Sequence, residues 1–585
     1  MTSRLTVLRT LTLVGVDARP VRVECAVAPG LPGLRLVGLP DVAVREAGER
    51  VRTAVQRAGF RWPQTRVVVN LAPADLPKAG SGFDLPIALA VLIASGQLLP
   101  AGEAPWVHGE VGLDGRLRDA AAHLAVAVGA RRLGAPRLLL PDGAAAGAAA
   151  RAVGGLLVAP AATLAEAAAV VAGRTPVRRP RAAAAAPPVP AGEDLADVRG
   201  QPVARRALEV AAAGGHHALL VGPPGCGKSL LARRLVGLLP DLDEAAALEV
   251  ATVHAVAGGP HAVPGPRPPL RTPQAGITAA ALVGGGSGLP RPGEVSLAHR
   301  GVLVLDELLE LTRPVLDALR QPLEEGRVAI DRARGRIELP ARFQLVATTN
   351  ACPCGMRGHP RRACTCPPDR VARYRARLSG PLLDRIDVVV PMAPLTGEEL
   401  TAATGGEPTA VVAARVAAAR TRAVARDGTT VAAAPMAGIR ATATPAALRT
   451  LTRGLEVLGG SARGFDRTLR VARTLADLAA APRVEEHHAA EALGWRPGAL
   501  PGAPEAPAGR RPVRRAAPPG APRSRPPTCR RRWRRRWRGR WRRRWRGRRR
   551  RRRRRWRRRR RRRGRRHGRA PDDRHLGRPR RPGRA

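Results

Sequence analysis

The sequence has few aromatic residues and almost no lysine. Aromatic residues make up 2% of the 585 residues, so a core must be built from the aliphatic part of a 44% hydrophobic fraction. The two lysines, Lys78 and Lys228, stand among 101 basic residues, so nearly every cation is an arginine. A lysine kept in such a background indicates a place that needs a compact ammonium rather than a planar guanidinium.

Long apolar runs and signal-peptide features are also missing. No uncharged apolar run reaches the roughly 18 residues of a membrane-spanning helix, and the start of the chain lacks a signal-peptide pattern. The alanine-rich residues 143–173 carry Arg151 and Glu166, and we expect them to form helix rather than a membrane span. The sequence therefore predicts a cytoplasmic protein with no membrane partner.

Most of the net charge of +55 lies at the carboxyl end. From residue 510 onward there are 41 arginines against two acids, and the unit WRRRWRGR at 533–540 recurs at 541–548. The tail is expected to be disordered, because such a charge density cannot pack a core. It either binds nucleic acid or is a frameshifted or repeat-expanded gene end without selected function. Residues 1–509 are also basic. Their charge either suits a polyanionic partner or reflects a genome rich in arginine codons.

Composition divides the chain into five consecutive parts. These are an α/β domain over 1–172, a linker rich in Pro, Ala and Arg over 173–192, a second α/β domain over 193–395, a helical segment over 396–497, and the tail over 498–585. In the first domain the patterns predict strands at 21–27 and 66–70 and helices at 41–58 and 84–96. The predicted fold class is therefore multidomain α/β.

A glycine-rich loop lies between a short apolar strand, residues 219–221, and an amphipathic stretch, residues 230–238. This strand, loop and helix order is that of a Walker A motif, in which backbone N–H groups surround phosphates at a helix N-terminus. Lys228 is expected to reach the β- and γ-phosphates of ATP, and the Ser229 hydroxyl to hold Mg²⁺. The predicted nucleotide-binding residues are Gly222, Pro223, Pro224, Gly225, Cys226, Gly227, Lys228 and Ser229.

Two later strands end in polar residues that suit the same site. Four apolar residues after Gly301 lead to Asp306 and Glu307, typical of a Walker B motif. Asp306 is predicted to bind Mg²⁺ through water, and Glu307 to act as the general base on the attacking water. A second buried strand, residues 343–349, ends at Asn350, which is either a sensor of the γ-phosphate or an ordinary turn residue.

Four of the seven cysteines fall in two pairs on a loop rich in Gly and Pro: Cys352, Cys354, Cys364 and Cys366. Four thiolates could close a tetrahedral Zn²⁺ site, with His359 as a further possible ligand. The C-x-C spacing is tighter than the usual gap of zinc ligands, so ordinary reduced thiols remain the alternative.

Several long segments resemble the ComM (YifB) family of magnesium-chelatase-like AAA+ proteins. They include the stretch from AGEDLADVRGQ to the Walker A motif, GEVSLAHRGVLVLDELLEL, VATTNACPCG and RLSGPLLDRID. The resemblance runs from about Thr6 to Pro497 and leaves out the tail. It implies a Lon-protease-like first domain, an AAA+ ATPase domain and a helical lid.

The same resemblance implies a hexameric ring in which a neighbour completes each ATP site. The arginine finger would be Arg385, in SGPLLDRID, and the sensor-two arginine would be Arg463, in SARGFDRTLRVARTLADL. It also implies a DNA motor that promotes branch migration when incoming DNA is recombined. Departures from the family pattern are Ala351 and Leu309, where prolines are usual, and Gln274-Ala275, where the family has paired histidines.

The first domain resembles the proteolytic domain of Lon, which uses a Ser nucleophile and a Lys base. In this chain the nucleophile position falls at Gly82, beside Ser81, and the base position falls near Leu124. Residues 109–141 contain no lysine. Because a Ser hydroxyl without a base is a poor nucleophile, we expect a structural or DNA-contacting domain without peptidase activity.

Apolar and charged residues alternate over 328–339 around a glycine, which predicts a β-hairpin. Similar hairpins in related ring ATPases line the central pore, where Arg332, Arg334 and Arg336 would contact a nucleic-acid backbone. The alternative is an edge hairpin protected by its charges. A glycine-rich insert over 284–294 is a second candidate pore loop.

The leading hypothesis is thus an ATP-driven DNA translocase. The alternatives are the motor subunit of a magnesium chelatase and a protein-remodelling AAA+ ATPase. A chelatase motor needs neither the Lon-like domain nor a basic body, and a remodelling ATPase is expected to carry a pore aromatic, which residues 265–338 lack.

Overall fold

The computed structural model describes residues 5–178, 193–258, 262–286, 290–332, 335–401 and 406–496. The chain divides into two units, residues 1–504 and 505–585, and all of the second lies outside the described residues. The predictions for the tail, and for the linker beyond residue 178, therefore concern residues outside this part of the chain.

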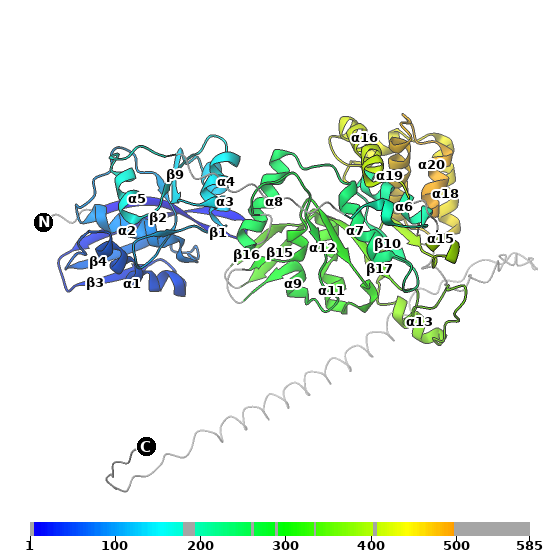
Figure 1. Cartoon of the computed structure of the whole chain (residues 1–585), viewed down its shortest axis with the longest axis horizontal. Coiled ribbons are helices and arrows are strands. Elements are labelled where there is room, and N and C mark those ends of the chain that lie inside the picture. The colour runs from blue at the N-terminus through cyan, green and yellow to red at the C-terminus, as the bar shows by residue number, and fades with distance from the viewer. Residues whose placement is uncertain are drawn as a thin grey trace, which may run out of the picture. The chain divides into compact units, whose positions relative to one another are not determined.

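The amino-terminal part contains a four-stranded sheet in the order β1-β2-β4-β3. Neighbouring strands are antiparallel except for β3 and β4. Helices α1 and α2 supply buried aliphatic side chains to the core beside this sheet, drawn in blue in Figure 1. The elements are β1 (Leu5–Val14), β2 (Asp17–Ala28), β3 (Gly33–Val37), α1 (Val42–Arg57), β4 (Arg66–Ala72), the 3-10 helix η1 (Ser81–Phe83) and α2 (Asp84–Ala94).

A second, parallel sheet follows in the same part, in the order β5-β8-β9. Its elements are β5 (Trp106–Val107), α3 (His123–Arg132), β8 (Arg137–Pro141), α4 (Ala144–Ala152), β9 (Leu157–Ala161) and α5 (Leu164–Val171), with the small hairpin β6 (Glu110–Val111) and β7 (Leu117–Arg118) between β5 and α3. The alanine-rich segment predicted as helix thus contains a strand, β9, because Leu157–Ala161 pairs in parallel with β8. That part of the helix prediction is wrong.

The central part is built on a five-stranded parallel sheet in the order β11-β14-β17-β10-β18. Strands β10, β14 and β17 are buried along their whole length. Strands β10 and β14 are unbroken apolar runs, whereas β17 also buries Gln344, Thr348 and Thr349. The strands are β10 (Ala218–Val221), β11 (Leu270–Arg271), β14 (Val302–Leu305), β17 (Gln344–Thr349) and β18 (Val388–Pro391).

Helices and small insertions surround this sheet. They are η2 (Leu195–Asp197), α6 (Pro202–Gly214), α7 (Lys228–Leu238), α8 (Glu244–Ala257), α9 (Ala279–Val283), α10 (Glu294–Leu297), η3 (Leu308–Glu310), α11 (Arg313–Ala318), α12 (Arg320–Glu325), α13 (Pro368–Arg375), α14 (Gly380–Leu383) and α15 (Gly397–Thr401). Two short ribbons also occur: β12 (Gly284–Gly285) with β13 (Arg291–Pro292), and β15 (Arg327–Arg332) with β16 (Gly335–Pro340).

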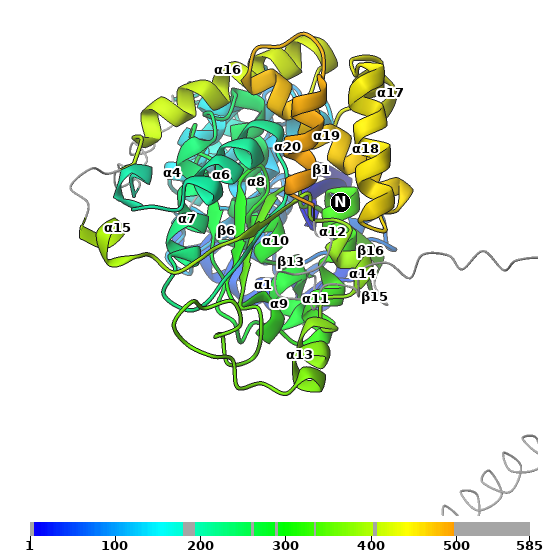
Figure 2. The same ribbon diagram turned by 90° about the vertical axis from the view of Figure 1, so that its right-hand side faces the viewer.

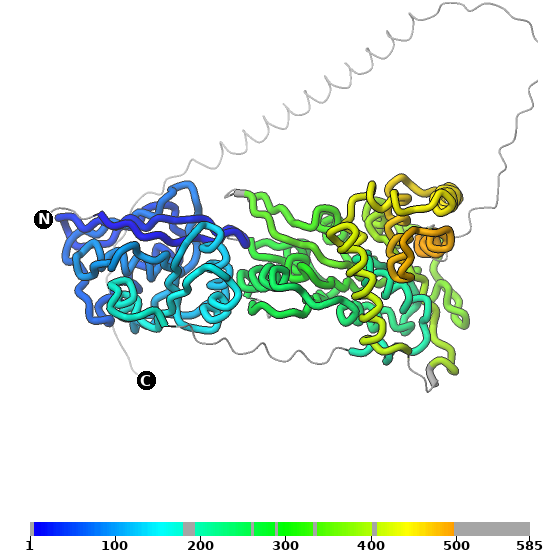
Figure 3. The backbone as a smooth tube through the Cα atoms, turned by 90° about the horizontal axis from the view of Figure 1, so that it is seen from above, coloured from blue at the N-terminus to red at the C-terminus, as the bar shows by residue number. Residues whose placement is uncertain are grey.

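The last described part is helical, as predicted. It consists of α16 (Thr409–Asp427), α17 (Met436–Ala441), α18 (Pro445–Val457), α19 (Ala462–Leu478) and α20 (Glu486–Gly494). Helices α18, α19 and α20 lie side by side, in yellow and orange in Figures 2 and 3. Helices α16 and α19 pack on α6, so this bundle shares one hydrophobic core with the central sheet. The predicted α/β fold class with a helical carboxyl-terminal region is confirmed.

Candidate functional site

The glycine-rich loop connects β10 to α7 at the carboxyl edge of the central sheet. Gly225 and Gly227 have φ angles of 80° and 86°, in the left-handed region that favours glycine. Gly222 passes so close to β18 that an added Cβ would lie 2.5 Å from the carbonyl oxygen of Met392. The loop therefore needs glycine at all three positions for backbone reasons.

Lys228 begins α7, and its side chain returns over the loop. Its Nζ donates to the carbonyl oxygens of Gly222 at 2.7 Å and Pro223 at 2.8 Å, and to Oδ1 of Asn350 at 3.0 Å. Burial lowers the pKa of Lys228 from its ordinary value. The predicted phosphate lysine and the predicted sensor asparagine are thus in direct contact.

The two carboxylates predicted from the Walker B pattern follow β14. Oδ2 of Asp306 accepts a hydrogen bond from Oγ of Ser229 at 2.7 Å, which brings together the two predicted Mg²⁺ ligands. Glu307 has a φ of 50°, so the chain turns sharply after Asp306. The structure places Lys228, Ser229, Asp306 and Asn350 around the same phosphate loop.

Thr348 belongs to this group and was not among the sequence-predicted residues. It lies on β17, fully buried, and its hydroxyl donates to Oδ1 of Asp306. The same hydroxyl accepts from the backbone N–H of Glu307 at 3.2 Å. The signal available in the sequence is the pair of threonines, Thr348 and Thr349, that ends this strand directly before Asn350.

Arg385 lies at the other edge of the same sheet. Strands β10 and β18 run parallel, with Ala218 opposite Val388 and Val221 opposite Pro391. Lys228 follows the end of β10, whereas Arg385 precedes the start of β18. Because a strand advances about 3.3 Å per residue, about 10 Å of buried sheet lies between the two edges. Arg385 therefore does not reach the phosphate loop of its own chain.

Arg463 lies beside Arg385 rather than beside the phosphate loop. Both arginines pair with Glu324, Arg463 at 3.9 Å, and Arg467, one turn after Arg463, donates to the carbonyl oxygen of Arg385 at 2.9 Å. Burial, with the neighbouring Arg463 and Arg467, lowers the pKa of Arg385. Nε of Arg385 is buried without a hydrogen-bond partner among the described residues.

The four paired cysteines converge, although Cys354 and Cys364 are ten positions apart in the sequence. Their Sγ atoms all lie within 4.8 Å of one another. The separations are 3.4 Å for Cys352 and Cys354, 3.6 Å for Cys354 and Cys364, and 3.5 Å for Cys364 and Cys352. This cluster could bind a metal ion.

His359 is not part of that cluster. Its Nδ1 instead accepts hydrogen bonds from the backbone N–H groups of Arg361 at 3.0 Å and Arg362 at 3.1 Å. The structure therefore assigns His359 to the turn between the two cysteine pairs, and the suggestion that it is a metal ligand is not supported.

The predicted hairpin is present as β15 and β16. Its inner face is apolar, with Val328 paired with Leu339 and Ile330 paired with Ile337. On the outer face Arg336 pairs with Glu338 at 3.0 Å. Arg334 and the side chain of Arg332 lie outside the described residues.

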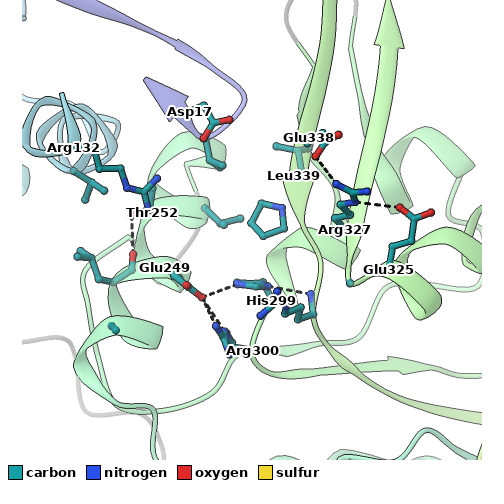
Figure 4. Close-up of a pocket in the computed structure, with 18 residues that line it drawn as sticks. Asp17, Arg132, Glu249, Thr252, His299, Arg300, Glu325, Arg327, Glu338 and Leu339 are labelled. Carbon is teal, nitrogen blue, oxygen red and sulfur yellow. Dashed lines mark hydrogen bonds and ion pairs between the residues drawn. The ribbon is translucent and has the colours of Figure 1, made fainter. Parts of the chain in front are cut away.

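Charged groups also form a network at the base of this hairpin. Arg327 pairs with Glu325 at 3.1 Å and with Glu338 at 3.0 Å (Figure 4). A separate carboxylate on α8, Glu249, accepts from His299 at 3.2 Å and Arg300 at 2.8 Å (Figure 4). In both groups the arginines already have acidic partners, so neither is an unpaired basic patch.

In the amino-terminal domain, the position predicted for a peptidase nucleophile is filled. A Cβ added to Gly82 would lie 2.1 Å from Nε2 of His108. Leu124, at the position of the base, is fully buried. The hydroxyl of the neighbouring Ser81 donates to the carboxylate of Glu110, which also pairs with Arg118 at 3.2 Å, and residues 109–141 contain no lysine.

The parallel sheet, the glycine-rich loop and the paired carboxylates define a P-loop protein of the AAA+ class. Three family profiles match the chain: "Magnesium chelatase, subunit ChlI" over residues 194–400, "Subunit ChlI of Mg-chelatase" over 23–144, and "Magnesium chelatase, subunit ChlI C-terminal" over 406–496. The chain belongs to the ComM and YifB family of magnesium-chelatase-like AAA+ proteins.

Its relatives match over almost their whole length. YifB of Salmonella typhimurium is 40% identical over 499 residues, covering 84% of this chain and 97% of that protein. An uncharacterized protein of Mycobacterium tuberculosis is 42% identical over 502 residues, covering 82% and 96%. The competence protein ComM of Haemophilus influenzae is 39% identical over 492 residues, covering 82% and 95%.

A membrane-spanning helix must be both long and apolar. Within the described ranges, no helix meets both requirements.

Proposed function

We propose that this protein is an ATP-hydrolysing motor that acts on DNA as a ring, most simply a hexamer, and promotes branch migration during recombination. ATP and Mg²⁺ are its cofactors. In this proposal Lys228 contacts the β- and γ-phosphates, Ser229 and Asp306 hold Mg²⁺, Glu307 activates water, and Asn350 senses the γ-phosphate. Thr348 is a positioning residue, since its hydroxyl fixes the Asp306 carboxylate.

The observation that carries the ring is the position of Arg385. It lies at the amino edge of the sheet, opposite its own phosphate loop, with Arg463 beside it. An arginine that completes an ATP site in this fold must then act on a neighbouring subunit. In this chain Glu324 holds the guanidinium of Arg385, so contact with a neighbour's phosphate requires the side chain to turn away from Glu324.

Arg385 is also connected to the β15–β16 hairpin through Glu324 on α12. Glu324, which binds Arg385, is near the end of α12, and β15 begins at Arg327 after Gly326. When Arg385 turns to a neighbour's γ-phosphate, Glu324 loses that partner, so the contact can bias the position of the hairpin. We propose that Arg332, Arg334 and Arg336 near the hairpin tip carry this change to the DNA backbone.

A DNA motor is favoured over the two alternatives, a magnesium-chelatase motor and a protein-remodelling motor. One relative at 39% identity is named a competence protein, and the ComM resemblance implies a DNA motor. In the amino-terminal domain His108 fills the nucleophile position, and we propose that this domain has no peptidase activity. A protein-remodelling motor is disfavoured because residues 265–338 contain no aromatic residue to grip a polypeptide.

The test is the ATPase rate with and without single-stranded and branched DNA. It should be run on the full chain and on a chain that ends after residue 500, so that the arginine tail is not the source of any stimulation. We expect slow basal hydrolysis that both kinds of DNA increase in both chains. Hydrolysis that does not respond to DNA in the shorter chain would contradict the DNA role and favour a chelatase-like or remodelling motor.

A variant of the β15–β16 hairpin tests whether the hairpin arginines make the DNA contacts that stimulate ATP hydrolysis. Replacing Arg332, Arg334 and Arg336 by Ala should reduce stimulation by DNA about tenfold or more, because each lost cation removes a phosphate contact. The matched control is Arg327→Ala, which removes an arginine at the base of the same hairpin, where β15 begins. Equal stimulation in the triple variant and the control would place the DNA contacts elsewhere.

A further inference from the structure

The four-cysteine cluster lies on the loop that joins β17 to α13, directly after the sensor position Asn350. Cys352 is fully buried, and the other three cysteines are partly buried. Free thiols on a surface loop have no reason to gather within 4.8 Å of one another. Their convergence therefore needs a physical cause.

A disulfide is not that cause. The Sγ separations of 3.4 to 3.6 Å are far longer than an S–S bond of about 2.05 Å. They are close to the edge of a tetrahedron of sulfurs around zinc, which is about 3.8 Å for a Zn–S distance of about 2.3 Å. The cluster thus has the ligand number and ligand type of a structural tetrathiolate zinc site, and three of its six Sγ separations are close to the tetrahedral edge.

Backbone N–H groups of the loop donate hydrogen bonds to two of these sulfurs. The N–H of Arg357 donates to Sγ of Cys352 at 3.3 Å, and the N–H of Met356 hydrogen bonds to Cys354. Such donors around coordinating sulfurs orient the ligands and stabilise their negative charge when a cation is bound. The polar surroundings therefore agree with thiolate ligation rather than with apolar burial of thiols.

The loop is also packed against the nucleotide-binding residues. A Cβ added to Gly355, between the two cysteine pairs, would lie 2.7 Å from Cδ of Pro224 in the phosphate loop. Nε of Arg375 on α13 donates to the carbonyl oxygen of Ala351 at 3.2 Å. The beginning of the loop is thus packed against the phosphate loop and bonded to α13, directly after Asn350, whose amide oxygen accepts from Lys228.

We infer that Cys352, Cys354, Cys364 and Cys366 bind one Zn²⁺ ion per chain, and that this ion fixes the loop after Asn350 against the phosphate loop. The inference that the cysteines bind zinc does not depend on the proposed motor activity. The positioning of Asn350 rests on the proposed function. Without the metal, no shared ligand holds the four cysteines together. The loop should therefore become more mobile next to Pro224.

The first measurement is the zinc content of the full-length protein by elemental analysis after dialysis against metal-free buffer. We expect one zinc per chain, and less than a tenth of that in the Cys364→Ser, Cys366→Ser double variant. The matched control is Cys25→Ala, a buried cysteine of the amino-terminal domain outside the cluster, which should keep its zinc. Growth with cobalt should give thiolate-to-cobalt charge-transfer absorption that the double variant lacks.

The single variant Cys366→Ser serves if the double variant fails to fold. Its three remaining thiolates should release zinc to a chromogenic chelator at least tenfold faster than the wild type. Zinc-free wild-type protein with four reactive cluster thiols, or full zinc retention in the double variant, would overturn the inference.

The positioning role has its own readout. Zinc removal should lower kcat for ATP hydrolysis at least tenfold, because the loosened loop follows directly on Asn350. It should change the Kd for ATP by less than threefold, because Lys228 keeps its hydrogen bonds to Gly222 and Pro223. An unchanged kcat in zinc-free protein would refute the positioning role while leaving zinc binding intact. Absence of ATPase activity in zinc-loaded wild type would instead refute the proposed function alone.

Discussion

Replacing Arg385 by Ala is expected to lower the ATPase rate by about 10³-fold or more, the usual contribution of an arginine finger to phosphoryl transfer. The side chain is 11% exposed and is bound to Glu324 in the isolated chain, so it must turn away from Glu324 to reach a neighbour's nucleotide. Arg385→Lys should recover little activity, because a point-like ammonium does not reproduce the planar set of guanidinium donors.

The decisive version of this test mixes two inactive proteins. Arg385→Ala subunits keep their own Lys228 and Glu307, and Glu307→Gln subunits keep Arg385. If Arg385 acts across the subunit interface, the mixture should hydrolyse ATP although neither variant does so alone. Arg313→Ala, which removes an 83% exposed arginine, is the control expected to resemble wild type. A mixture that stays inactive while its rings assemble would contradict action in trans.

Glu307→Gln should reduce ATP hydrolysis by about 10²-fold or more while ATP still binds, because an amide cannot take the proton from the attacking water. Nucleotide binding should persist, since Lys228, Ser229 and Asp306 keep their hydrogen bonds. The measurements are steady-state phosphate release and the Kd of a fluorescent ATP analogue.

The control for this substitution is three residues away. Glu310 is also an exposed glutamate of the same turn, paired with Arg377 at 3.5 Å. Glu310→Gln should keep the ATPase rate within threefold of wild type. If both glutamines had the same effect, the loss would report a disturbed turn and not a missing base.

The phosphate-site residues were predictable because their signals are local. Gly222 and Asp306 each follow an apolar strand directly, and Lys228 follows the glycine-rich loop. A strand followed by such a loop and a helix predicts a phosphate site without knowledge of the rest of the fold. The predicted helix at 230–238 begins two residues earlier, at Lys228, because the phosphate loop passes directly into α7.

The remaining contacts depend on pairing between distant segments. Thr348 reaches Asp306 only because β17 lies beside β14 in the sheet. Glu324 meets Arg385 across 61 residues of sequence, and no periodicity in either segment indicates this contact. Strand β9 was missed because its sequence, LVAPA, is short and lies in alanine-rich surroundings, and its pairing with β8 decided its conformation.

Because lysine is so scarce in this chain, an amine-specific reagent can label the glycine-rich loop selectively at Lys228. Lys78 is fully buried and its Nζ donates to the carbonyl of Pro73, which leaves Lys228 as the one partly accessible lysine side chain of the chain. An amine-acylating reagent should therefore modify two places, the amino terminus and Lys228, and saturating ATP with Mg²⁺ should protect only the second. Peptide mass spectrometry would then report nucleotide occupancy in the full-length protein without any engineered label. Equal acylation of Lys228 with and without ATP would contradict its contact with the phosphates.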